Sequence, residues 1–276
     1  MVIIGQTLQA HKGLTTEHLL RFTRLLGFEL CEINPAGTSL ENIDKIIPLV
    51  GDMPLTFHLP IQGIENFEFA QPNKKDDIKD IIKLINNNKE DLNLILGVFH
   101  PPEADNGNLK TLVENLSQLD IKLVVENVPD YTDNEFIEIY NTLKDHLGEQ
   151  LKGWLFDVAH SYLVNGPSNF MEILNILPFK ELEEIHLSDC LEDRDAHYAF
   201  GAGVLPINEI LREIKDRKFD RIIVNEIDAY PSIWSVIDSY RMVAKLFKKR
   251  LYRKVTFRYR LVKPLIQKKL SKAGIA

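Results

Sequence analysis

The sequence predicts an α/β protein built as a single (β/α)8 barrel, the TIM barrel fold, followed by a basic C-terminal extension. Its 276 residues are close to the length of about 250 that such a barrel typically needs. Eight short apolar runs alternate with longer segments of helical periodicity, which is the order of elements in this fold. Residues able to bind metals follow the apolar runs, where a barrel carries its active site.

The predicted strands are short runs rich in Val, Ile, Leu and Phe. They are apolar along most of their length, as expected of parallel strands that are covered on both faces. We predict eight strands, at Val2–Thr7, Glu29–Asn34, Leu55–Leu59, Leu92–His100, Lys122–Val128, Gly153–Val158, Glu184–Ser188 and Arg221–Ile227.

The segments between the strands carry apolar residues at positions i, i+3, i+4 and i+7, which is typical of helices with one buried face. We predict helices at Thr16–Leu26, Asn42–Leu49, Asp76–Asn87, Leu109–Leu119, Asp133–Leu147, Pro167–Leu177, Pro206–Asp216 and Ser232–Phe247. The stretch Ile61–Asn73 is longer than a usual connection, which indicates a lid or a substrate loop.

The net charge of −7 hides an uneven distribution along the chain. From Lys245 onward the sequence has 12 Lys and Arg and no Asp or Glu. The remainder of the chain therefore contains 21 of the 33 basic residues and all 40 acidic residues. We therefore divide the chain into a barrel at 1–249 and a basic tail at 250–276.

The tail alternates basic and aromatic residues from Arg250 to Arg260. This pattern suits phosphate backbones and bases, or an anionic membrane surface. Beyond it, a short helix broken near Pro264 would carry apolar residues on one face, namely Leu261, Leu265, Ile266 and Leu270. Because the body is acidic, we favour packing of the tail on the body or on a second subunit. A homo-oligomer is therefore possible, and binding of the tail to nucleic acid is not favoured.

The chain shows no targeting or membrane signal. No apolar run reaches the roughly 18 residues of a membrane span, and the N-terminus lacks the features of a signal peptide. Cys31 and Cys190 are too few for a disulfide framework, so we expect a cytoplasmic protein. Cys190 is interpreted as a small buried residue rather than a metal ligand.

The seventh strand leads into the stretch that organises the predicted site. His186 is followed by Asp195 and His197, in a loop that contains Gly201 and Gly203. Imidazoles and carboxylates together are ligands for borderline and hard divalent metals. The other strands of a barrel should then deliver matching ligands at their C-terminal ends.

Six successive strands do end in such residues. Any one of them is more often a core or loop residue than a ligand, but a buried carboxylate without a partner costs several kcal/mol. Together they predict compensating divalent cations. The candidate metal ligands are His58, His100, Glu126, Asp157, His160, His186, Asp195, His197 and Glu226.

This pattern, from about the third strand to the eighth helix, resembles the xylose isomerase-like barrel superfamily and its endonuclease IV-like branch, which includes AP endonuclease family 2 and sugar phosphate isomerases or epimerases. The segments Asp157–His160 and Asp195–Gly203 are the most specific parts of the match. The resemblance implies three zinc ions. One would be held by His58, His100 and Glu126, a second by Glu126, Asp157, His186 and Glu226, and a third by His160, Asp195 and His197.

The resemblance implies phosphoester hydrolysis, in which clustered ions clamp phosphate oxygens and acidify a bridging water. The stretch Cys31–Thr38 lacks the Arg and aromatic residues with which DNA-repair members of the branch read abasic sites. The run Glu126–Pro129 also departs from their pattern. We therefore predict a zinc-type phosphoester hydrolase for a small phosphorylated or sugar substrate.

Two alternatives stay open. A sugar or sugar-phosphate isomerase or epimerase would use one metal on Glu126, Asp157, His186 and Glu226. There, Glu126 and Glu226 would move the proton and His160 would contact a substrate hydroxyl. A non-catalytic scaffold would show gaps in the ligand set, and the sequence shows none. Zn²⁺ is the favoured metal, with up to three ions, although Mn²⁺ or Fe suits the carboxylates nearly as well.

Overall fold

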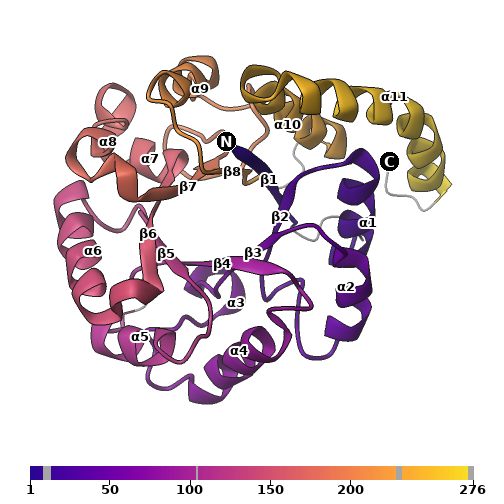
Figure 1. The fold of residues 1–276 in the computed structure, drawn as a ribbon. Helices are drawn as coiled ribbons and strands as arrows, with labels where there is room; N and C mark the ends of the chain where they lie inside the picture. Colours follow the sequence, from indigo (N-terminus) through magenta and orange to yellow (C-terminus); the bar gives the residue numbers. More distant parts are fainter. Residues whose placement is uncertain (9–13, 104, 228–231, 273–276) are drawn as a thin grey trace.

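The computed structural model describes residues 1–8, 14–103, 105–227 and 232–272. Eight parallel strands form a closed barrel in sequence order, with helices around it, which confirms the predicted fold (Figure 1). The strands are β1 (Ile3–Thr7), β2 (Leu30–Ile33), β3 (Leu55–His58), β4 (Leu94–Phe99), β5 (Leu123–Glu126), β6 (Leu151–Asp157), β7 (Leu182–Leu187) and β8 (Ile222–Asn225). Each predicted strand overlaps one of these.

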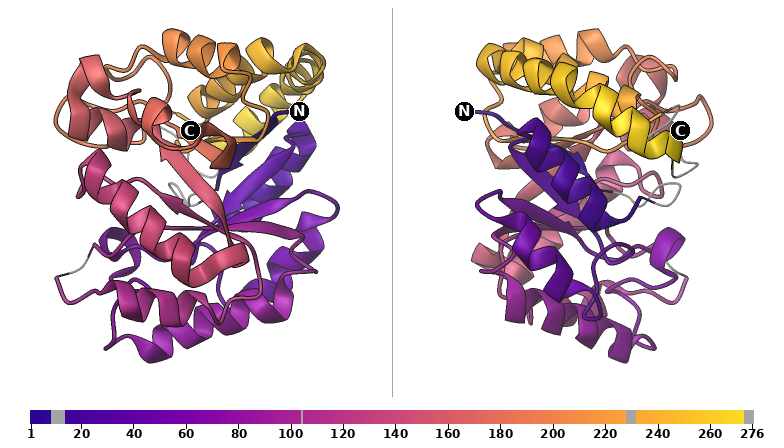
Figure 2. Two further views of the ribbon diagram at one scale, coloured as in Figure 1. Left: turned by 60° about the vertical axis from the view of Figure 1, so that its left-hand side comes forward. Right: turned by 90° about the vertical axis from the view of Figure 1, so that its right-hand side faces the viewer.

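The helices of the described chain cover the outside of the barrel (Figures 1 and 2). They are α1 (Thr16–Leu26), α2 (Ile43–Val50), α3 (Gln62–Glu65), α4 (Lys75–Asn88), α5 (Leu109–Leu116), α6 (Asp133–Leu147), α7 (Val158–Asn169), α8 (Ile173–Ile176), α9 (Ile207–Asp216), α10 (Ile233–Phe247) and α11 (Lys249–Lys272). Short 3-10 turns, η1 (Gly148–Gln150) and η2 (Phe179–Glu181), precede β6 and β7. Within the described ranges, no helix combines the length and apolar character that a membrane crossing requires.

The predicted helix at 167–177 corresponds to the end of α7, after a kink at Gly166, and to α8, so the prediction missed the first part of α7. Helix α7 begins directly after β6, because the Asp157 carboxylate accepts a hydrogen bond from the backbone N–H of His160 at 2.7 Å and so caps the helix. Gly166 has a φ of 70°, which breaks the helical path before Pro167. The consequence is that His160 lies on a helical first turn instead of in a loop.

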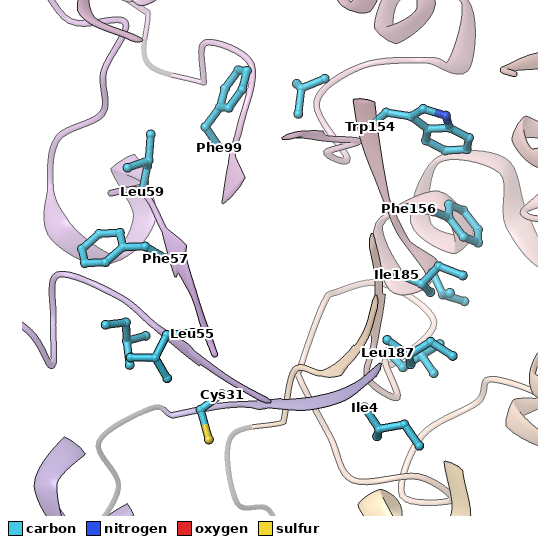
Figure 3. Packing of buried hydrophobic residues seen from close by; sticks show 14 of the residues in the cluster. Ile4, Cys31, Leu55, Phe57, Leu59, Phe99, Trp154, Phe156, Ile185 and Leu187 are labelled. Carbon is cyan, nitrogen blue, oxygen red and sulfur yellow. The ribbon is translucent and has the colours of Figure 1, made fainter. Parts of the chain in front are cut away.

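The apolar core lies between the strands and the surrounding helices. Figure 3 shows Phe57 on β3 and Trp154 and Phe156 on β6 pointing away from the barrel axis, and all three are fully buried. Inside the barrel, a smaller apolar cluster is made by Leu30, Leu96, Val98, Val124, Leu155, Ile222 and Val224. Side chains alternate in direction along a strand, so the next inward residues after this cluster are polar.

The segment after β3 is partly packed on the barrel. Helix α3 has no buried residue, but Phe69 and Ala70 are buried behind it. The Glu68 carboxylate accepts a hydrogen bond from the backbone N–H of Glu103 at 2.9 Å, which ties this segment to the loop after β4. Its proposed role as a lid or substrate loop stays a prediction.

The basic tail forms one continuous helix. Helix α11 runs through Pro264, so the predicted break there is wrong. It packs alongside α10 and α1, on the outside of the barrel (Figure 2).

Candidate metal centre

All nine predicted ligands lie at the C-terminal end of the barrel. Because the strands are parallel, residues that end different strands meet at one rim. His58, Glu126 and Asp157 end β3, β5 and β6, while His100 and Glu226 directly follow β4 and β8. His186 is the next-to-last residue of β7, His160 comes from α7, and Asp195 and His197 come from the loop after β7.

The first group consists of His58, His100 and Glu126, whose ligand atoms lie within 4.8 Å of one another. Both imidazole Nε2 atoms lie 3.3 Å from Glu126 Oε2. The Nδ1 atom of His58 must carry the proton, because it donates to the carbonyl oxygen of Leu59 at 2.9 Å. The Nδ1 atom of His100 bonds to the Glu103 carboxylate, so both rings present Nε2 to the site.

The second group consists of Glu126, Asp157, His186 and Glu226, all of them buried. Nδ1 of His186 lies 3.0 Å from Glu226 Oε2 and 3.6 Å from Glu126 Oε2. Glu126 therefore belongs to both the first and the second group, as a bridging carboxylate would.

The third group consists of His160, Asp195 and His197. Asp195 Oδ2 lies 3.1 Å from Nε2 of His160 and 2.7 Å from Nε2 of His197. His160 donates from Nδ1 to the carbonyl oxygen of Asn127 at 2.9 Å, which again leaves Nε2 for the site. His197 has a φ of 43°, a left-handed backbone that is strained for a residue with a side chain.

Asp189 holds the loop that carries the third group. Its buried carboxylate accepts hydrogen bonds from the backbone N–H groups of Gly201, Gly203, Leu205 and Cys190, at 2.8 to 3.1 Å. A Cβ at Gly203 would lie 2.1 Å from the carbonyl oxygen of Cys190, so only glycine fits there. Gly203 is thus required for the close approach of the loop to Asp189, whereas Gly201 adopts a φ of 85°, which favours glycine.

The sequence-based analysis missed a second carboxylate layer under the site. Glu32 on β2 and Glu184 on β7 are fully buried, and their carboxylates lie 3.5 and 3.7 Å from Nε2 of His186. The hydroxyls of Thr7 and Thr56 donate to Glu32 at 3.2 and 3.0 Å, which fixes it from both neighbouring strands. The available signal was a Glu inside an apolar strand, which is uncommon without a partner.

Two further histidines lie away from the site. His18 and His146 are exposed on α1 and α6, and His11 lies outside the described residues. Cys190 is buried and belongs to none of the ligand groups, consistent with its interpretation as a small buried residue.

Burial and neighbouring charges shift the pKa values of the site in opposite directions. Burial raises the pKa of Asp157 to about 7, although the charge of His160 works against this. Burial disfavours charge on His100 too, but the carboxylates of Glu126 and Glu103 override it and raise the pKa of that imidazole to about 10. Without a metal, protons on the imidazoles balance the carboxylates.

The orphaned atoms of the site fit a divalent cation. Several buried ligand atoms make no hydrogen bond within the described part of the chain, and they are His100 Nε2, Glu126 Oε1, Asp157 Oδ2 and His186 Nε2. Leaving such atoms unpaired costs free energy, which an ion on the buried carboxylate and imidazole groups would offset. The residues present are therefore a divalent metal site by their chemistry.

Metal removal should destabilise the protein. We expect chelator treatment to lower the Tm by about 10 °C, because an ion at a large excess over its Kd contributes about 4 kcal/mol. Thermal unfolding with and without added Zn²⁺ or Mn²⁺ measures this. His100→Ala should reduce the metal-dependent rise, and His146→Ala, at an exposed histidine, should leave it unchanged. An identical Tm in all these states would contradict a metal site.

Asp189→Ala should destabilise the loop. The change leaves the backbone N–H groups around it without their acceptor, so we expect a loss of about 3 kcal/mol in the free energy of unfolding. Denaturant unfolding measures the loss. Asp193→Ala, at an exposed aspartate of the same loop, is the control and should change the free energy by less than about 0.5 kcal/mol.

Known proteins share this fold. A structure described as a D-tagatose 3-epimerase-like protein aligns with a TM-score of 0.63 and 22% identity, covering 92% of this chain and 99% of that chain. A 3-keto-D-glucoside 4-epimerase from E. coli aligns with a TM-score of 0.61 and 15% identity, over 89% and 100%. An AP endonuclease, family 2, from Brucella melitensis aligns with a TM-score of 0.64 and 14% identity, over 86% and 97%.

At these identities the structural likeness establishes the fold alone. No curated protein sequence matches the chain significantly. The sequence profile of the family described as xylose isomerase-like TIM barrel matches residues 20–249, which span β2 to the end of α10. The chain therefore belongs to the xylose isomerase-like TIM barrel family.

Proposed function

We propose that this protein is a metal-dependent isomerase or epimerase that acts on a small sugar or sugar phosphate. The observation that carries the proposal is the buried second group, in which Glu126 and Glu226 approach the same imidazole nitrogen of His186. The two solved structures named as epimerases or epimerase-like add support, since they share the fold over nearly their whole length.

The chemistry of the proposal follows from the two glutamates. Asp157, His186, Glu126 and Glu226 would hold the ion, and a bound divalent cation would polarise the carbonyl and hydroxyl oxygens of a sugar. One glutamate then takes a proton from the carbon beside the carbonyl, and the same or the other glutamate returns it. Epimerisation needs return to the opposite face, which is why two carboxylates are useful here.

His160 is the third proposed functional residue. Its ring is buried, and its orientation is fixed by the Nδ1 bond to the carbonyl oxygen of Asn127. With Nδ1 protonated, Nε2 is free to accept a hydrogen bond from a substrate hydroxyl, or to bind an ion of the third group.

Phosphoester hydrolysis is the second candidate, and a specific observation favours it. An isomerase that works with one ion has no need of the first and third groups, yet the structure brings all of their ligands together. Three ions around Glu126 could clamp a phosphate, with zinc as the ion that best matches so many imidazoles.

Substitution of either glutamate tests the isomerase proposal. We expect Glu126→Gln and Glu226→Gln to lower kcat by about 100-fold or more, because a Gln amide cannot accept a proton. The assay incubates a panel of ketoses and ketose phosphates in D2O and follows deuterium incorporation at carbon by NMR. Glu192→Gln, at an exposed glutamate of the loop after β7, is the matched control. Unchanged deuterium exchange in both variants would contradict the assignment.

A double substitution in the third group separates the two candidates. For a one-metal isomerase, Asp195→Asn with His197→Gln should leave one ion per chain and most of the exchange activity. For a multinuclear hydrolase, the same change should remove about one ion from two or three and abolish phosphodiester and phosphomonoester cleavage. Elemental analysis of protein purified without chelator, with both assays on the same samples, decides between them.

A further inference from the structure

Helix α11 lies beyond the part of the chain that the family profile matches. The family match ends at residue 249, and α11 begins at Lys249. The helix lies outside the ring of helices, against α10 and α1 (Figures 1 and 2). It has no part in the metal centre, so its composition needs a separate explanation.

The inner face of α11 is used for packing. Leu251, Val255 and Tyr259 are buried at positions four residues apart, which is one face of a helix. The Arg241 guanidinium lies over the rings of Tyr252 and Tyr259, at 5.7 and 5.3 Å from their centroids. Two of the three aromatic residues of the basic stretch are therefore engaged within the protein and are not available to stack on bases.

The outer face of α11 is exposed and has no carboxylate. The side chains on it recur at helical spacing and form one stripe, which consists of Arg250, Arg253, Phe257, Arg260, Leu261 and Pro264. Phe257 and Leu261 are 65% and 61% exposed, unusually high for large apolar side chains next to each other on a helix. The three cations form no ion pair within the described part of the chain, although the body of the protein is acidic.

Exposed apolar residues between unpaired cations are the arrangement of a helix that lies in a membrane interface. The apolar side chains enter the boundary between head groups and acyl chains, while the long Lys and Arg side chains reach the phosphates around them. We infer that the outer face of α11 binds a membrane surface rich in anionic phospholipids, with Phe257 and Leu261 inserted and Arg250, Arg253 and Arg260 at the head groups.

The same observations argue against nucleic acid as the partner. Single-stranded nucleic acids are held by several aromatic rings in a row along a basic groove. The outer face of α11 offers one ring, that of Phe257, and it is convex because it is the surface of a single helix. Charge alone would attract DNA or RNA, but it gives no role to Leu261.

Vesicle binding by the full chain tests the inference. We expect the protein to sediment with vesicles of phosphatidylcholine containing about one part in three of phosphatidylglycerol, and not with phosphatidylcholine alone. Phe257→Ser with Leu261→Ser should lower the partition coefficient by about tenfold or more. Arg253→Glu with Arg260→Glu should do the same, and added salt should weaken binding of the unaltered protein.

Matched controls separate a specific face from net charge. Lys79→Glu with Lys83→Glu makes the same charge change on the exposed surface of α4, and Ile176→Ser removes another exposed apolar side chain, on α8. Both should bind vesicles as the unaltered protein does. Circular dichroism checks that every variant is folded.

Three results would overturn the inference. One is absence of sedimentation with the anionic vesicles, and another is equal loss of binding in the α4 control. The third is a different occupant of the same face. That would be seen as binding to single-stranded DNA but not to vesicles, or as a dimer in solution that Phe257→Ser with Leu261→Ser converts to a monomer.

Discussion

Buried charge at the C-terminal end of the barrel is the constraint on which the rest of the site depends. Four carboxylates and five imidazoles make up the three ligand groups, and within each group the ligand atoms lie within 4.8 Å of one another. Each of these groups would be costly to bury alone, so they are tolerated only as a set that shares protons or cations. Glu126 is the centre of the set, because it lies against imidazoles from four different elements, which are His58, His100, His160 and His186.

Local hydrogen bonds and ion pairs, some of them made by a member of the set itself, keep the set in place. Asp189 ties down the loop with the third group, Asp157 caps the helix that carries His160, and Glu32 lies behind His186. In these contacts each residue holds a backbone group or an imidazole in position. Such preorganisation is what a metal centre needs, since ligands that must reorganise on binding reduce the affinity.

The barrel and its C-terminal helix carry different kinds of chemistry. The barrel concentrates carboxylates and imidazoles in a buried rim, whereas α11 carries unpaired cations and apolar side chains on an exposed face. The family profile covers the first and stops where the second begins. A catalytic domain and an attachment surface would thus be separate parts of one chain, and either could change without disturbing the other.

The sequence by itself determined the number, order and type of the strands and most of the helices. It did so because apolar periodicity and strand-end chemistry are local properties. The same reasoning predicted that the nine candidate ligands share one rim, since parallel strands bring their C-terminal ends together in any barrel. It missed the start of α7, because that helix begins where the Asp157 side chain caps it and not where apolar periodicity begins.

The division of those residues into three groups was already implied by the family resemblance, and only the tertiary structure decided which residues support them. Glu32, Glu184 and Glu103 are ordinary acidic residues in the sequence. Glu32 lies against His186, which is far away along the chain, whereas Glu184 and Glu103 lie against His186 and His100, which are near to them in the sequence. The two faces of α11 were likewise undetermined, because the sequence shows which residues share a face but not which face is packed. Spatial proximity, unlike periodicity, depends on the packing of the whole barrel.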